Sequence, residues 1–570
     1  MPLSAMLIPI PISSTGTIKE NTVSLQEQDQ NLITPSATPS ASPSDLIEEV
    51  SERRTFAIIS HPDAGKTTLT EKLLLYGGAV QLAGSVTARR SQRHAASDWM
   101  AMEQQRGISI TSTVLAFPYK GHHLNLLDTP GHQDFSEDTY RTLTAVDSAV
   151  MVLDGARGIE PQTLKLFEVC RRQHMPIFTF INKIDRPALH PLEMMDQIER
   201  TLGMKTYPMN WPIGDGNEFR GVYDRMTRTV HLFERTEHGS KQAPVRVSSL
   251  DDPLLDIRIG AERAAQLREE MELLEMAGTP FDLAEVLSGR LTPVCFGSAM
   301  TNFGVQLFLD LFLTYAPAPK EHATSERVME PTDPVFSGFV FKIQANMDPR
   351  HRDRVAYLRI VSGKFERDME AWHPRLKRKV RLSRPMRLFG QDREVVDEAF
   401  AGDVVGLINP GTFTIGDTIS SENVGEFAAL PRFQPEFFSM IRHARADRYK
   451  QFLKGLVQIE EEGAIQLFYP TASGSREPIL GAVGALQFDV VKFRLEAEYN
   501  VETIMETLGY SAARWVGGDE AEITTIGNAR GRMRAEDKMG RPVILFTTEW
   551  DLRYAEEHAE NVTFQSLAEM

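Results

Sequence analysis

The chain has 570 residues, which is too long for one hydrophobic core and predicts about three domains. Its two cysteines, Cys170 and Cys295, lie far apart in apolar runs, which excludes a disulfide framework and favours a reducing compartment. A net charge of −16 argues against a simple polyanion-binding protein, because affinity for phosphate backbones comes from clustered Lys and Arg.

The first segment, residues 1–50, is rich in Ser, Thr, Pro and Gln and has Lys19 as an early basic residue. A secretory signal needs a basic start and a longer apolar run, and a transit peptide needs Arg. We therefore predict a disordered N-terminal tail. No run of 18 apolar residues occurs in the sequence, so we expect no membrane span and a cytoplasmic protein.

A phosphate-binding loop follows the short apolar run Phe56–Ile59 and precedes a helical pattern from Leu69 to Tyr76. Lys66 can reach the β- and γ-phosphates, and the Thr67 hydroxyl can ligate Mg²⁺. A small residue, Ser60, stands where the motif usually has its first Gly. The predicted nucleotide-binding residues of this loop are Ser60, His61, Pro62, Asp63, Ala64, Gly65, Lys66, Thr67 and Thr68.

A second polar motif ends the predicted strand 123–127. In this position Asp128 can hold Mg²⁺ through water, and the Gly131 amide can donate to the γ-phosphate. The residues that we predict to contact the nucleotide here are Asp128, Thr129, Pro130, Gly131 and His132.

The base-recognition motifs follow two further apolar strands, 176–181 and 293–296. Asp185 can accept two hydrogen bonds from guanine N1–H and N2–H₂, a donor pair that adenine lacks. We expect the stem of Lys183 to cover the base and Asn182 to tie this segment to the phosphate loop. Ser298 and Ala299 follow the last strand and would offer an amide to guanine O6.

Strands alternate with helical stretches through this region, and each polar motif follows the carboxyl end of a strand, as with the apolar strand 149–153. This order predicts an α/β P-loop GTPase domain, residues 51–320, with a mostly parallel, doubly wound sheet. We expect GTP as its substrate, GDP as its product and Mg²⁺ as its cofactor.

Hydrolysis of GTP needs a group that positions the attacking water. His132 follows the Asp-Thr-Pro-Gly motif, where no Gln is present, and we interpret it with Lys66 as catalytic. Between the two phosphate motifs, residues 97–100 and 105–111 form a polar stretch that a γ-phosphate can order. A hydroxyl of this stretch should complete the metal ligands Thr67 and Asp128; Ser109 is favoured over Thr111. No arginine occupies an obvious finger position, so we predict slow intrinsic hydrolysis that a partner accelerates.

Beyond a linker at 321–333, alternating strands with Gly-containing turns, including one over 379–388, predict a β-barrel domain at residues 334–425. Strands mixed with helices at 449–461 and 486–499 predict an α+β domain at 430–550, followed by a C-terminal tail at 551–570, frayed or a short helix. The barrel carries a basic patch, either an rRNA or ribosomal-protein contact or a solvated face: Arg350, Arg352, Arg354, Arg375, Lys377, Arg378, Lys379, Arg381, Arg384 and Arg387.

The motifs Asp-Ala-Gly-Lys-Thr-Thr, Arg-Gly-Ile-Ser-Ile, Asp-Thr-Pro-Gly-His and Asn-Lys-Ile-Asp together resemble the translational GTPases. The phosphate-loop phrase, the phrase at 453–464 and Gly-Ala-Leu-Gln-Phe-Asp-Val-Val at 484–491 are similar to the peptide chain release factor 3 family. The resemblance covers about residues 50–550. It implies that His132 is the catalytic histidine, which rRNA positions, and that Pro62 and Ile108 form the apolar gate around it. Ser109 stands where elongation factors have Thr.

The resemblance implies a cytoplasmic, ribosome-activated GTPase of translation termination that ejects and recycles the class I, codon-reading release factors. Its implied partners are the ribosome and those factors, with no membrane or DNA, and we expect a monomer. The chain length favours this over a translocase-like elongation GTPase, which needs two more domains. A GTP-sensing binding module without turnover is the other alternative, and replacement of His132 distinguishes it.

Overall fold

A computed structural model describes residues 43–78, 102–103, 109–236, 239–242, 247, 249–345, 354–389, 392–471 and 477–566. Most of the expected tail, residues 97–100 and 105–108 of the polar stretch, and Arg350 and Arg352 lie outside these ranges. The tail was predicted to extend to residue 50, but helix α1 (Pro43–Ser51) begins within it. Leu46 and Val50, one turn apart on this helix, pack against Phe400 and Ala401, which explains why the end of the segment is ordered.

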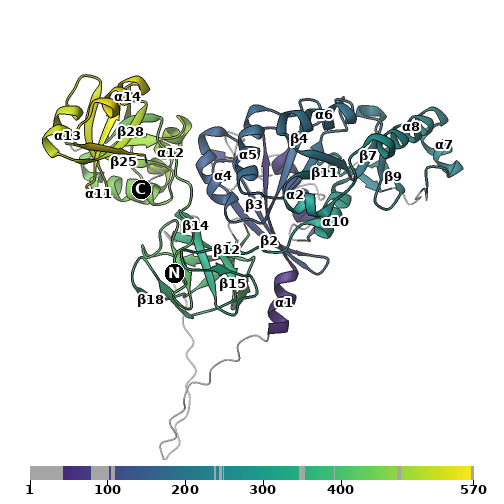
Figure 1. Cartoon of the computed structure of the whole chain (residues 1–570), viewed down its shortest axis with the longest axis horizontal. Coiled ribbons are helices and arrows are strands. Elements are labelled where there is room, and N and C mark those ends of the chain that lie inside the picture. The colour runs from purple at the N-terminus through teal and green to yellow at the C-terminus, as the bar shows by residue number, and fades with distance from the viewer. Residues whose placement is uncertain are drawn as a thin grey trace, which may run out of the picture. The chain divides into compact units, whose positions relative to one another are not determined.

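The nucleotide-binding part contains a sheet in the order β2-β3-β1-β4-β5-β11-β6, and all but one of its neighbouring pairs are parallel (Figure 1). The exception is the hairpin of β2 and β3. The fold class predicted from the sequence is therefore confirmed. The strands are β1 (Arg53–Ser60), β2 (Thr113–Tyr119), β3 (His122–Asp128), β4 (Ser148–Asp154), β5 (Ile177–Asn182), β6 (Lys205–Pro208) and β11 (Leu291–Phe296).

Alternate residues of each strand face opposite sides of the sheet and meet different helices. Ile58 packs in one cluster with α2 (Lys66–Tyr76) and α10 (Val305–Tyr315). Its neighbour Ile59 packs in another cluster with α5 (Pro161–Arg172) and α6 (Pro191–Leu202), and α4 (Ser136–Leu143) joins the same side. The sheet is thus covered on both faces by helices.

An insertion between β6 and β11 was not predicted from the sequence. It contains a four-stranded antiparallel sheet, β7 (Asn210–Ile213), β8 (Gly221–Asp224), β9 (Thr229–Thr236) and β10 (Gly239–Gln242). It also contains η2 (Gly216–Glu218) and the helices α7 (Pro253–Ile259), α8 (Ala261–Ala277) and α9 (Leu283–Leu287).

The second region is an antiparallel, barrel-like sheet, as expected. A continuous strand over 379–388 was expected, but Arg384 has a left-handed backbone (φ 52°) and separates β18 from β19. Its strands are β14 (Ser337–Ala345), β15 (Arg354–Ser362), β16 (Lys364–Glu366), β17 (Glu370–His373), β18 (Arg378–Arg381), β19 (Pro385–Phe389), β20 (Asp392–Val395), β21 (Glu398–Phe400), β22 (Val404–Ile408) and β23 (Thr418–Ser420). Two short strands, β12 (His322–Ala323) and β13 (Val328–Met329), lie in the preceding linker.

The third region is an α+β fold on an eight-stranded sheet in the order β27-β24-β26-β25-β29-β30-β28-β31. Residues 551–570 were predicted to be a tail that is either frayed or a short helix, and the helix is present as α14 (Glu549–His558). The strand β31 (Val562–Gln565), which pairs with β28, was not predicted. The other elements are β24 (Phe437–His443), η3 (Ala446–Arg448), α11 (Tyr449–Glu461), β25 (Gln466–Pro470), β26 (Ile479–Ala482), α12 (Leu486–Tyr499), β27 (Thr503–Leu508), β28 (Ala512–Gly518), α13 (Glu520–Gly527), β29 (Arg532–Asp537) and β30 (Pro542–Phe546).

The helices in the described part of the chain include none that is both long and apolar enough to cross a bilayer.

Candidate functional site

The phosphate loop joins β1 to α2 and ends at Gly65, which has a left-handed backbone (φ 97°) and precedes the first helical residue. No side chain caps this helix, so its first amides can serve an anion. A Cβ on Gly65 would lie 2.2 Å from the Asn182 Nδ2 atom. Both the backbone angle and the close neighbour therefore require glycine at this position.

Lys66 and Asp128 are in contact at the start of α2 and the end of β3. The Lys66 Nζ atom lies 2.6 Å from Asp128 Oδ1, and both side chains are buried. The second oxygen, Asp128 Oδ2, is buried with no hydrogen-bond partner among the described residues. A buried carboxylate oxygen with spare acceptor capacity fits the water shell of Mg²⁺, which prefers oxygen ligands.

Hydrogen bonds within the protein position the residues after Asp128, before any nucleotide binds. The Thr129 hydroxyl donates to the Ile58 carbonyl of β1 at 2.7 Å. The Pro130 carbonyl accepts from the Thr139 hydroxyl of α4 at 3.3 Å. A Cβ on Gly131 would lie 3.6 Å from the Cα of Pro62, so this loop and the phosphate loop face each other closely.

Asn182, at the end of β5, holds three motifs together. Its Nδ2 atom donates to the Ala64 carbonyl at 2.9 Å, and its Oδ1 atom accepts from the amides of Lys183 at 2.9 Å and Ala299 at 2.8 Å. The tie to the phosphate loop expected for this residue is present. An amide of Ser298 or Ala299 was expected to face guanine O6. In the structure the Ala299 amide donates to Asn182, and the Ser298 amide donates to the Phe303 carbonyl. The contact with O6 therefore stays a prediction.

Asp185 lies beyond Asn182 with a buried Oδ1 atom that has no hydrogen-bond partner among the described residues. Nearby, the Lys183 ammonium donates to the Asp63 carbonyl and lies 2.8 Å from Asp154 Oδ2 at the end of β4. Burial opposes ionisation of Asp154, but the hydrogen bonds from Lys183 and the Ala156 amide outweigh it and lower its pKa. The Lys183 ammonium is thereby held between the phosphate loop and the end of β4.

His132 caps the short helix η1 (Gln133–Phe135). Its Nδ1 atom lies 3.2 Å from the Asp134 amide nitrogen and 3.2 Å from Asp134 Oδ1. The His132 side chain is 32% exposed, so part of it faces solvent. In contrast, His61 of the phosphate loop pairs with Glu160, with 3.2 Å between Nε2 and Oε1.

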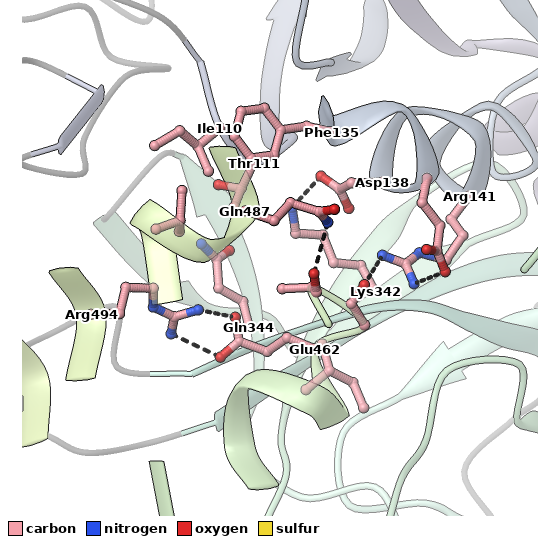
Figure 2. A pocket seen from close by; sticks show the side chains of 15 residues that line it. Ile110, Thr111, Phe135, Asp138, Arg141, Lys342, Gln344, Glu462, Gln487 and Arg494 are labelled. Carbon is pink, nitrogen blue, oxygen red and sulfur yellow. Dashed lines mark hydrogen bonds and ion pairs between the residues drawn. The ribbon is translucent and has the colours of Figure 1, made fainter. Parts of the chain in front are cut away.

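The end of the polar stretch is held by Glu103, whose Oε1 atom accepts from the amides of Ile110 at 2.9 Å and Thr111 at 3.2 Å. Ser109 is half-buried just before this contact. Thr111 lines a cavity of about 50 Å³ between α4, β14 and α12, shown in Figure 2.

The cavity contains a group of charged side chains that sequence reasoning did not identify. Lys342 of β14 lies 3.2 Å from Asp138 of α4, and Arg494 of α12 donates to both oxygens of Glu462 at 2.8 and 2.9 Å (Figure 2). Burial opposes the charge on Asp138, but Lys342 and Arg141 outweigh it and lower the pKa of Asp138. A lysine within the otherwise apolar strand Phe339–Ile343 was the available signal for this group.

Comparisons with known protein families divide the sequence into three matches. Residues 51–318 match the elongation factor Tu GTP binding domain, and residues 335–422 match elongation factor G domain 2. Residues 427–556 match the C-terminal domain of the class II release factor RF3.

Curated relatives match over nearly their whole length. A peptide chain release factor 3 from Synechocystis sp. is 60% identical over 89% of this chain and 93% of the relative. One from Gloeobacter violaceus is 58% identical over 92% of this chain and 99% of the relative. A solved structure from Thermus thermophilus superimposes with a TM-score of 0.64 over 85% of this chain and 72% of that one, at 22% identity, and so supports the fold.

Proposed function

Because the chain belongs to the peptide chain release factor 3 family, we propose that the polar side chains at the strand ends form the site with which it hydrolyses GTP. It is a GTPase of translation termination. The elongation alternative raised by the sequence is not favoured, since the relatives are release factors and the C-terminal region matches that family.

The site assignment rests on two buried carboxylate oxygens that have no hydrogen-bond partner among the described residues. They lie at or just beyond the carboxyl ends of two strands of the sheet. Asp128 Oδ2 lies at the phosphate end, and Asp185 Oδ1 lies at the base end. Leaving a buried acceptor without a hydrogen bond costs about 1–3 kcal/mol of stability, so a ligand that donates to either oxygen would be bound favourably. Guanine N1–H and N2–H₂ would satisfy Asp185, and the hydration shell of Mg²⁺ would satisfy Asp128.

The metal ligands that we propose are the hydroxyls of Thr67 and Ser109, with Asp128 acting through water. Support for Ser109 over Thr111 comes from the cavity, because Thr111 lines it on the side of α12 (Figure 2). When bound, Mg²⁺ neutralises charge on the phosphates during hydrolysis.

The remaining groups divide the work of phosphoryl transfer. Lys66, at the start of α2, neutralises the β- and γ-phosphate oxygens together with the free amides of the helix. His132 orients the attacking water through its imidazole. The Lys183 stem covers the guanine, while Asn182 keeps the base and phosphate ends in register.

The family implies a ribosome partner, so we propose that the ribosome accelerates hydrolysis and that the factor, as a cytoplasmic monomer, removes class I release factors after peptide release. The exposed cations of β18 are candidates for contact with rRNA phosphates. We assign these activities to a nucleotide domain at 51–320, a barrel at 334–425 and a C-terminal domain that includes α14 and β31.

The test measures dissociation of a labelled class I release factor from post-termination ribosomes with this protein and GTP, GDP or a non-hydrolysable GTP analogue. Multiple-turnover recycling with GTP is expected for the unchanged protein. His132→Ala should retain GTP binding and lose recycling turnover. Undiminished turnover by His132→Ala would exclude a hydrolytic role for His132, and tRNA translocation without recycling would exclude the termination assignment.

A further inference from the structure

We propose that Asp134 is the positioning residue of His132 and that helix α12, more than 350 residues away in the sequence, sets the position of Asp134. The proposal rests on the catalytic role proposed for His132. It names the contact through which the C-terminal region controls that histidine.

Asp134 presents both a donor and an acceptor to the same ring nitrogen. Its backbone amide and its Oδ1 atom each lie 3.2 Å from His132 Nδ1. A neutral imidazole with an unprotonated Nδ1 accepts from the amide, whereas an imidazolium donates from Nδ1 to the carboxylate. In both forms Nδ1 is occupied, so Nε2 remains the nitrogen that can face the attacking water.

The second carboxylate oxygen of Asp134 is held by α12. The Leu486 amide, at the first residue of the helix, donates to Asp134 Oδ2 at 2.8 Å. The N-cap residue Ala485 supplies no side-chain hydrogen bond, so Asp134 acts as the missing cap from another part of the chain. Its negative charge also suits the positive end of the helix dipole.

The approach between the two segments is too close for a side chain on Gly484. A Cβ at this position would lie 2.3 Å from both Cβ and Cγ of Asp134. Gly484 precedes the N-cap residue Ala485 in the Gly-Ala-Leu-Gln phrase. Its absent side chain is therefore what allows the Asp134 carboxylate to reach the Leu486 amide.

An apolar cluster beside this contact joins the same parts of the chain. Phe135, next to Asp134, packs with Val490 of α12, with Met102 and with Ile110 of the polar stretch. The carboxylate contact and the cluster share one helix, so a displacement of α12 shifts Asp134 and Ile110 together. Asp134 is nearly buried, which leaves its carboxylate few other partners.

The experiment compares Asp134→Asn and Gly484→Ala with Gly509→Ala, a control whose added Cβ would meet nothing within 4 Å. Asn keeps the size of Asp and removes its charge, and the Gly484 variant leaves Asp134 unchanged but pushes the helix start away. For both, ribosome-stimulated kcat for GTP hydrolysis should fall at least tenfold. The affinity for GTP, and the ribosome concentration that gives the half-maximal rate, should each change less than twofold. In the control variant, kcat should also change less than twofold.

A spectroscopic readout separates positioning from general damage. With ¹⁵N-labelled histidine, the Nδ1 resonance of His132, assigned by its loss in His132→Ala, should shift in Gly484→Ala and not in Gly509→Ala. If His132→Ala abolishes turnover while Asp134→Asn and Gly484→Ala keep full kcat, the positioning role is wrong and the proposed function stands. If His132→Ala keeps turnover, the catalytic role proposed for His132 is wrong, and the positioning role fails with it.

Discussion

The side-chain amide of Asn182 donates a hydrogen bond to the carbonyl oxygen of Ala64, 2.9 Å away, and so joins the end of β5 to the phosphate loop. Replacement by Ala also leaves the Ala299 amide without its partner. Losing these buried bonds should cost about 2–4 kcal/mol. We expect GDP and GTP to bind roughly 30- to 1000-fold more weakly.

Fluorescent-nucleotide titration measures this loss, and Asn182→Asp provides a partial replacement. Asp retains an acceptor for the Ala299 and Lys183 amides but cannot donate to Ala64. Its affinity should therefore lie between those of the unchanged protein and Asn182→Ala. Equal affinity of all three proteins would show that the tie does not support the site.

Gly65→Ala should abolish measurable nucleotide binding, because a Cβ would lie 2.2 Å from Asn182 Nδ2 and the backbone is left-handed. Gly78→Ala is the matched control, since Gly78 also has a left-handed backbone (φ 70°) but no neighbour within 4 Å. That control should lose about 1 kcal/mol of stability and bind nucleotide normally. Equilibrium binding and thermal unfolding on both variants test the difference.

Asp185→Asn should move base preference from guanine towards xanthine. Xanthine presents a carbonyl where guanine has N2–H₂, and an Asn amide can donate to it. We expect GTP affinity to fall by roughly 100-fold or more, because a buried polar group is left mismatched. Competition between GTP and XTP measures the change, and retained guanine preference would contradict the role of the buried Asp185 Oδ1 atom.

Glu137 should make stability depend on pH. Burial raises its pKa to about 7, against the opposing effect of Arg141, from an ordinary value of 4.5. Glu137 binds its proton more tightly in the folded protein than in the unfolded chain. Its contribution to the free energy of unfolding is therefore complete below about pH 4.5 and is lost as the pH rises through 7. Glu137→Gln should remove this loss, which amounts to about 3 kcal/mol.

The measurement is the thermal midpoint at pH 5 and pH 8. The thermal midpoint of Glu137→Gln, relative to that of the unchanged protein, should be higher at pH 8 than at pH 5. Glu496→Gln, which alters an exposed carboxylate of α12, should follow the unchanged protein at both values. Parallel curves for all three proteins would argue against a raised pKa at Glu137.

The exposed face of β18 should contribute to ribosome affinity through phosphate contacts. Replacing Arg378, Lys379 and Arg381 together by Gln should weaken binding and flatten its dependence on salt concentration, since fewer counterions are released. Binding to ribosomes at several salt concentrations tests this, with a control triple replacement at three exposed cations of α5 and α6: Lys165, Arg172 and Arg200. An unchanged salt slope would mean that the patch is a solvated face.

The sequence determined the parallel sheet and the positions of its polar motifs, because each motif directly follows an apolar strand. Thus Asp128 ends β3 and Asn182 ends β5, and the carboxyl ends of parallel strands meet at one edge. Helices α11 and α12 were also predicted with their observed bounds, since their apolar periodicity is local. The strands of the insertion and β31 were missed because strands of four to eight residues give little periodic signal.

Only the tertiary structure decided which distant groups meet. Asp134 and Leu486, or Lys342 and Asp138, are hundreds of residues apart and carry no shared local pattern. Their pairing depends on which helix face and strand end are buried together, and burial then forces each charge or amide to find a partner. The residues of the nucleotide-binding motifs can therefore be predicted from short segments of the sequence. The contact between His132, Asp134 and α12 arises only from packing.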